Sequence, residues 1–402
     1  MPLLLLLLVL LLPATPVATP SALLGINYGR VGNNLPPTTS ALQLLAGLGV
    51  GRVRLYDADP ATLRSFAKRA SSSSSASPTS ASPPSPPPPA PPPGSALTPS
   101  LLPAMQCIHD VLVQLGLDKQ VAVTTAHNLG VLATSYPPSS AYFRKDLLPV
   151  LCPILDFHAR TGSPFLVNAY PYFAYAEDPA GVELEYALLE PGHSGVPDPS
   201  SGLRYPNMLV AQVDAVYHAI TATNRVVARA VEVRVSETGW PSTGDSNETG
   251  ATPRNAARYN GNVMRLVGEG KGTPLRPDGA LRVYMFALFN ENMKPGPSSE
   301  RNYGLFKPGG TPVYELAYRL RKDNATTSSG VGGITAGGGG YNGHGDGQQN
   351  NGYYSITASA KANMATEKAS VCLVMPFVSP KVIISWHKGA CHCLIQHSDD
   401  VL

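Results

Sequence analysis

The chain has little cysteine for its length. Its 402 residues include five cysteines, too few and too scattered for a disulfide framework, at positions 107, 152, 372, 391 and 393. The odd number leaves at least one of them unpaired within the chain. Stability must therefore come from a hydrophobic core, and a chain of this length with 43% hydrophobic residues can form a large one.

The chain also has little charge and few clustered metal ligands. Charged residues make up 14% of it, the formal net charge is +3, and no long run of lysine or arginine occurs. We therefore expect no nucleic-acid partner, because the basic surface that a phosphate backbone requires is absent. The cluster Cys391-His392-Cys393 near the C-terminus matches no usual zinc spacing, so we expect no metal and no cofactor.

The N-terminus carries the longest apolar run, MPLLLLLLVLLLPATPVATPSALL. About a dozen apolar residues followed by small ones are typical of a secretory signal and are too few to span a bilayer. We expect a signal peptide over residues 1–22, cleaved between Ala14 and Ala22, and no stable membrane insertion. Export to the cell exterior or wall agrees with the glycosylation sequons at Asn247 and Asn324.

Residues 321–402 form a Gly-rich, polar tail, and we expect it to be disordered and of low complexity. Its apolar stretch VCLVMPFVSPKVIIS contains two prolines and Lys381 and is followed by a polar end. A lipid-anchor signal ends in an uninterrupted apolar run instead. We therefore expect a secreted, unanchored monomer.

Between residues 23 and 320, β-branched or aromatic runs alternate with amphipathic helical patterns. Strict alternation predicts a parallel sheet wrapped by helices. Polar residues follow the apolar middle of each predicted strand, as in a (β/α)8 TIM barrel, whose site lies where the strands end. The six predicted strands begin at Gly25, Gly51, Val121, Phe165, Val231 and Arg282.

Two strands of such a barrel are missing from the sequence. Where the third and fourth would lie, residues 71–100 include the tract SSSSSASPTSASPPSPPPPAPPPG. Proline offers no N–H for a β-ladder and the tract has almost nothing apolar to bury, so we expect a disordered, partly polyproline II insert. Such a barrel has open edges on the predicted strands 51–57 and 121–127.

Two acidic segments follow predicted strands. VSETGWPSTG places Glu237 at a strand end and Trp240 beside it, and an indole ring is a surface on which a sugar can stack. FALFNENMKPGPSSERNYGLF adds Glu291, Lys294 and Glu300. The alternatives are a solvated loop residue for Glu237 and a surface ion-pair cluster for the second segment.

The segment VNAYPYFAY is unusually aromatic. Its consecutive rings cannot all face one core, so some of them are expected to line a groove together with Asn168. The alternative is that the rings merely cover the top of the barrel.

Five motifs together resemble the plant glucan endo-1,3-β-glucosidases of glycoside hydrolase family 17. The similarity covers about residues 24–69 and 101–318, and the motifs are GINYGRVGNNLP, RVRLYDADP, VNAYPYFAY, VSETGWPSTG and FALFNENMKPGPSSERNYGLFKPGGTPVYEL. The resemblance implies a TIM barrel and retaining hydrolysis of β-1,3-glucan. It also implies Glu237 as nucleophile, with Glu291, Lys294 and Glu300 supporting the site. It further implies that Tyr28, Tyr170 and Phe173 belong to the glucan groove, to which the motifs described above add Asn168 and Trp240.

The family's proton donor is the glutamate of a Gly-Asn-Glu motif on the fourth strand, and this sequence contains no Gly-Asn-Glu. Retaining hydrolysis needs two carboxyl groups about 5 Å apart. Three explanations remain open: a truncated gene or splice form, a non-catalytic glucan-binding wall protein, or an enzyme that uses another acid such as Glu291. A structural wall protein is a further alternative, based on SPPSPPPP.

Overall fold

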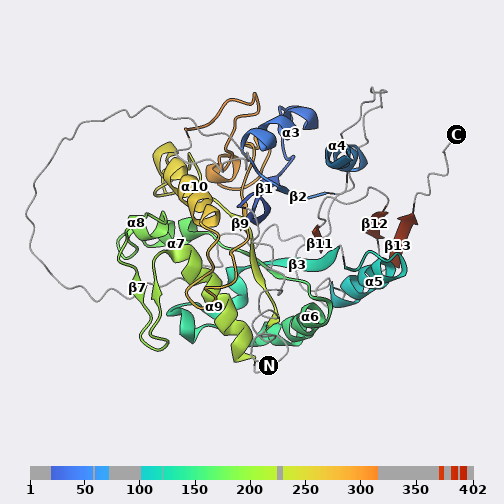
Figure 1. Cartoon of the computed structure of the whole chain (residues 1–402). Helices are drawn as coiled ribbons and strands as arrows, with labels where there is room; N and C mark the ends of the chain where they lie inside the picture. The colour runs from blue at the N-terminus through green and yellow to red at the C-terminus, as the bar shows by residue number, and fades with distance from the viewer. Residues whose placement is uncertain are drawn as a thin grey trace, which may run out of the picture.

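The protein is described by a computed structural model, shown in Figure 1. It describes residues 20–57, 59–71, 101–119, 121–223 and 230–315, and the backbone of three later strands, 371–374, 382–387 and 390–395. Several expectations fall outside these residues: the signal peptide up to residue 19, the Ser/Pro tract 72–100, Asn324 and most of the tail.

All six predicted runs form parallel strands of one curled sheet. In spatial order the strands are β3-β6-β9-β10-β1-β2, and every neighbouring pair is parallel. This is the arrangement of a partial TIM barrel. The bounds are β1 (Leu24–Tyr28), β2 (Arg52–Leu55), β3 (Ala122–Asn128), β6 (Phe165–Asn168), β9 (Val233–Thr238) and β10 (Val283–Met285).

Helices alternate with the strands and lie around the outside of the sheet (Figure 1). Side chains cap three of them: Asp59 accepts from the Thr62 N–H before α4, Asn207 accepts from the Val210 N–H before α9, and Thr252 accepts from the Asn255 N–H before α10. The longer helices are α3 (Thr38–Gly47), α4 (Pro60–Ser71), α5 (Leu101–Gln114), α6 (Leu148–Thr161), α9 (Met208–Ala222) and α10 (Pro253–Gly268).

Shorter elements decorate the chain between these. The short helices are α2 (Pro20–Leu23), α7 (Pro171–Glu177) and α8 (Leu184–Ala187), with 3-10 turns η3 (Leu129–Val131), η4 (Pro138–Ser140), η5 (Lys145–Leu147) and η7 (Ser298–Arg301). Two short antiparallel pairs are β4 (Leu132–Thr134) with β5 (Tyr142–Phe143) and β7 (Val196–Pro197) with β8 (Arg204–Tyr205). No helix in the described ranges combines the length and apolarity needed to cross a membrane.

The core is divided into two clusters. The larger one contains the apolar residues of β1, β6, β9 and β10 and of the helices α3, α9 and α10. A smaller one lies between β3, α5 and α6, and contains Met105, Ile108, Leu112, Val121, Val123, Ile154 and Phe157. Because β3 lies next to one end of the sheet, its helices form a packing unit of their own.

The structure differs from the expected pair of open sheet edges at one of the two strands. Strand β2 pairs only with β1 within the described part of the chain. The outer edge of β3, however, pairs antiparallel with β11 (Val371–Val374), in a register that places Val371 opposite Thr125 and Val374 opposite Ala122. The strands β12 (Val382–His387) and β13 (Ala390–Ile395) form an antiparallel pair. These three segments form strands, whereas we expected no regular structure in the tail.

Candidate active site

The polar residues at the strand ends lie at one edge of the sheet, because parallel strands all end on the same side. Strands β6 and β9 place Asn168 and Glu237 in register as neighbours. Asn168 accepts a hydrogen bond from the Ser236 hydroxyl at 2.7 Å, which ties the ends of these two strands together. Glu237 is thereby presented next to the aromatic segment that follows β6.

Three donors hold the Glu237 carboxylate. Arg54 of β2 contacts Oε1 at 2.5 Å, and the hydroxyl of Tyr56 donates to the same oxygen at 2.9 Å. The hydroxyl of Tyr170 donates to Oε2 at 3.0 Å. The carboxylate is therefore charge-compensated and fixed in direction, although the Glu237 side chain remains 14% exposed.

Both tyrosines act as stable donors. Burial of the phenol groups, and then the charge of Glu237, hold the pKa of Tyr56 and of Tyr170 well above the usual value. Tyr56 as a residue is 40% exposed, but its hydroxyl end lies against the carboxylate. Each phenol keeps its proton at neutral pH and continues to donate to Glu237.

Glu291 is the more deeply buried of these two glutamates, at 2% exposure. Its Oε1 accepts the backbone N–H of Val31 at 2.7 Å, and its Oε2 lies 3.5 Å from the ammonium of Lys294. The Lys294 nitrogen in turn lies over the ring of Phe286, 3.9 Å from the centroid. The structure thus brings Glu291 and Lys294 together as an ion pair.

Glu300 lies on η7 and interacts electrostatically with the same group. Burial raises its pKa, the nearby Lys294 opposes that shift, and the charges of Glu237 and other glutamates add to it. Glu237, Glu291, Lys294 and Glu300 therefore form one interacting set.

Gly29 is required by the close approach of Glu291. A Cβ built at position 29 lies 2.4 Å from both carboxylate oxygens of Glu291, so Gly29→Ala must displace that side chain. We expect a loss of about 1–3 kcal/mol in the free energy of unfolding, measured by urea denaturation. Gly47→Ala is the matched control, since a Cβ added at position 47 meets nothing within 4 Å. Equal stability of the two variants would contradict this packing.

Two aromatic residues that we expected in the glucan groove, Trp240 and Tyr28, are buried in the core. Trp240 is fully buried, with its indole N–H donating to the Gly250 carbonyl at 2.8 Å and its ring packed against Tyr172 and Tyr259. Tyr28 is 2% exposed. Neither offers a free ring face to a sugar, because each completes the hydrophobic core below the strand ends.

Tyr170 and Phe173 are closer to the expectation. They are only partly buried, and their ring centroids lie 5.2 Å apart. Tyr170 also packs edge-on against Tyr303, at 5.8 Å. Of these three rings, Tyr170 contacts the Glu237 carboxylate through its hydroxyl, and Phe173 and Tyr303 pack against Tyr170.

The sequence reasoning missed Arg54 and Tyr56. The two residues are two positions apart, at the end of β2 and just after it, so they share one face, and the Arg54 guanidinium lies 4.9 Å from the centre of the Tyr56 ring. The available signal was the alternation of two arginines, Arg52 and Arg54, with apolar residues in a strand that is followed by tyrosine and aspartate. The Arg54 side chain is only 9% exposed, which requires a partner.

Comparisons with known proteins find relatives of this sequence. A sequence model of the family described as "Glycosyl hydrolases family 17" matches residues 93–318. Glucan endo-1,3-beta-glucosidase 10 of Arabidopsis thaliana is 48% identical over 338 residues, covering 77% of this chain and 78% of the relative. Glucan endo-1,3-beta-glucosidase 11 of the same plant is 44% identical over 335 residues, covering 76% and 77%.

Solved structures with the same fold include two plant enzymes. A beta-1,3-glucanase and allergen of Cryptomeria japonica pollen matches with a TM-score of 0.62 and 29% identity, covering 74% of this chain and 99% of the other. A structure from a study of two plant beta-glucan endohydrolases with distinct substrate specificities matches with a TM-score of 0.60 and 29% identity, covering 73% and 100%.

Proposed function

Because the chain belongs to glycosyl hydrolase family 17, we propose that it acts on β-1,3-glucan and that Glu237 is the nucleophile of a retaining reaction. The observation that carries this proposal is the Glu237 carboxylate held by Arg54, Tyr56 and Tyr170. Three fixed donors keep the carboxylate in place and aimed, as attack on an anomeric carbon requires. Tyr170 and Phe173 would contact the sugar rings.

The first chemical step would form a bond between a Glu237 oxygen and the anomeric carbon. The bond from that carbon to the leaving oxygen breaks, and the leaving oxygen takes the electron pair. A sugar alkoxide is a poor leaving group, so this oxygen must receive a proton from an acid. The sequence lacks the Gly-Asn-Glu that would supply the acid, and the buried Glu291 is occupied by Lys294.

The nucleophile half of the proposed site is therefore intact, and its acid half is deficient. This predicts turnover of substrates whose leaving group needs no proton. The full chain should release dinitrophenolate from 2,4-dinitrophenyl β-laminaribioside, and it should cleave linear β-1,3-glucan at least about 100-fold more slowly, the usual size of an acid–base contribution.

Azide provides the control for the acid half of the site. As an anion it attacks the glycosyl-enzyme without help from a base, so it should raise turnover of the aryl glycoside about tenfold or more and give a β-glycosyl azide. Rapid glucan cleavage without an azide effect would mean that another carboxyl serves as the acid. In that case the loss of glucan cleavage in Glu300→Gln or in Glu291→Gln identifies it.

A second outcome of the same assays would support the rival function. Glucan retention in a pull-down, with no turnover of either substrate, is the behaviour of a non-catalytic glucan-binding protein.

We further propose that the protein is secreted as a monomer and carries a glycan at Asn247. That asparagine belongs to a sequon and is exposed between β9 and α10. Mass spectrometry of the secreted protein tests whether Asn247 carries the glycan.

A further inference from the structure

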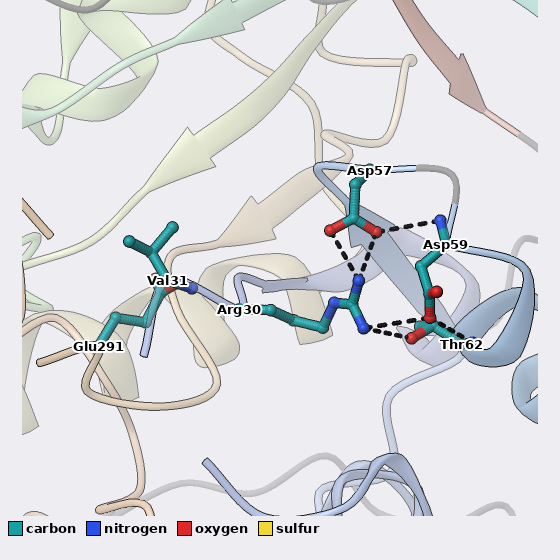
Figure 2. Close-up of polar contacts among 6 residues, drawn as sticks. All are labelled: Arg30, Val31, Asp57, Asp59, Thr62 and Glu291. Atoms are coloured by element: carbon teal, nitrogen blue, oxygen red, sulfur yellow. Dashed lines mark hydrogen bonds and ion pairs between the residues drawn. The ribbon is translucent and has the colours of Figure 1, made fainter. Parts of the chain in front are cut away.

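A cluster of charges joins the loop after β1 to the turn after β2 (Figure 2). The guanidinium of Arg30 contacts both carboxylate oxygens of Asp57 at 2.9 Å. A second guanidinium nitrogen, Nη1, donates to the Thr62 hydroxyl at 2.8 Å and to the Asp59 carboxylate at 3.1 Å. Asp59 in turn accepts the backbone N–H of Thr62 at 2.8 Å, in the first turn of α4. Arg30 therefore links the loop after β1 to the turn after β2 and to the first turn of α4.

The same loop is fixed from its other side. The N–H of Val31, the residue next to Arg30, donates to Glu291. In Figure 2, Val31 and Glu291 lie on one side of the loop, and Arg30 points away from them toward Asp57 and Thr62. The loop is consequently held between the Glu291 side of the site and the end of β2.

The end of β2 depends on these contacts more than an interior strand would. Within the described residues β2 has a strand neighbour on one side only. The turn that follows it nevertheless carries Tyr56, whose hydroxyl contacts Glu237 and whose neighbour is Asp57. An exposed ion pair contributes little by itself, but an arginine that contacts three side chains in one network restrains the groups that it joins.

We propose that Arg30 is a positioning residue that holds Tyr56 on the Glu237 carboxylate by anchoring Asp57. The inference rests on the proposed function of Glu237. Arg30 contacts no reacting atom in this scheme. It acts through Asp57 and Tyr56, so its effect should disappear when the Tyr56 hydroxyl is absent.

The first test needs no catalysis. A 3-fluorotyrosine placed at position 56 reports the surroundings of the phenol by 19F NMR, and its resonance should shift on Glu237→Gln. In Arg30→Gln the resonance should move or broaden, and the response to Glu237→Gln should be lost. An unchanged resonance that still responds to Glu237→Gln would overturn the proposal.

The control for this test is Arg144→Gln. Arg144 makes a comparable two-point pair with Asp146 on another surface loop, so its loss should leave the resonance unchanged. If Arg30→Gln does not fold, as judged by circular dichroism, Asp57→Asn performs the same test from the other partner.

The second test measures glycosyl-enzyme formation. A 2,4-dinitrophenyl 2-deoxy-2-fluoro-β-laminaribioside should label wild-type Glu237, as followed by intact-protein mass spectrometry. Arg30→Gln should lower the maximal labelling rate about tenfold and leave the inhibitor dissociation constant unchanged, since a misplacement of about 1 Å can cost about 100-fold and a smaller one costs less. A larger dissociation constant, meaning weaker inhibitor binding, with an unchanged maximal labelling rate would contradict a positioning role.

A double-mutant cycle distinguishes action through Tyr56 from general damage. In a Tyr56→Phe background, adding Arg30→Gln should lower the rate by less than about twofold. Additive losses would refute the route through Tyr56. If wild type is not labelled at all, the proposed nucleophile is wrong, whereas the 19F result still decides whether Arg30 holds Tyr56.

Discussion

Glu237→Gln is expected to lower the rate of aryl-glycoside turnover by more than about a thousandfold. The amide has nearly the same shape as the carboxylate, so Tyr56 and Tyr170 can remain in place, but its oxygen is a far weaker nucleophile. Glucan binding should change little, because the aromatic side chains around the site are untouched. Initial rates of dinitrophenolate release and a glucan pull-down measure the two effects.

The control for this prediction is Glu269→Gln. Glu269 forms a surface pair with Arg265 at the end of α10, away from the strand ends, so its loss should leave the rate unchanged. A Glu237→Gln protein that retains wild-type turnover would remove Glu237 from the mechanism. Equal losses in both variants would indicate damage to folding instead.

The second large effect concerns acid stability and the buried imidazole of His158. This residue of α6 is fully buried, and neither ring nitrogen has a hydrogen-bond partner within the described part of the chain. Burial, and secondly the neighbouring His127, lower the pKa of His158 to about 3. Burial likewise lowers the pKa of His127 to about 4. The folded protein thus keeps both rings neutral where the unfolded chain, with an ordinary pKa near 6.5, takes up protons.

Because the pKa of His158 is lower in the folded than in the unfolded protein, the free energy of unfolding falls as the pH falls. Above pH 6.5 the contribution of His158 to stability is complete, and it is lost progressively as the pH falls from there toward 3. Between pH 7.5 and 5.0 the free energy of unfolding should fall by about 2 kcal/mol for this group alone. Urea denaturation of wild type and His158→Leu at several pH values measures it. The variant should have the shallower pH dependence, and parallel curves would show that His158 does not titrate on unfolding.

The sheet could be predicted from the sequence because its signals are local. Each apolar run followed by a polar residue became a parallel strand, and Glu237 lies at the end of β9 as expected. The boundaries were less certain: the predicted strand from Val231 begins at Val233, and that from Arg282 covers only Val283–Met285. Strand ends depend on pairing with neighbours, which a single sequence window does not contain.

The partners within the site could not be predicted, because they come from distant parts of the chain. Arg54 and Glu237 are separated by 183 positions and meet only when β2 and β9 stand in one sheet. Trp240 follows the glutamate in a turn, which made it look accessible, yet Tyr172, Tyr175 and Tyr259 enclose its ring. Exposure is a property of the assembled layers and is not encoded in the residues next to the tryptophan.

The pairing of β11 with β3 has a consequence for the order in which the protein is made. Thr125 and Val371 are opposite each other in the sheet but roughly 250 residues apart in the chain. A ribosome adds about 5–20 residues per second, so the edge of β3 waits about 12–50 s after its synthesis before its partner exists. During that interval the backbone N–H and C=O groups of β3 are free to pair with another nascent chain, and chaperone demand should be greatest while residues 125–371 are being translated.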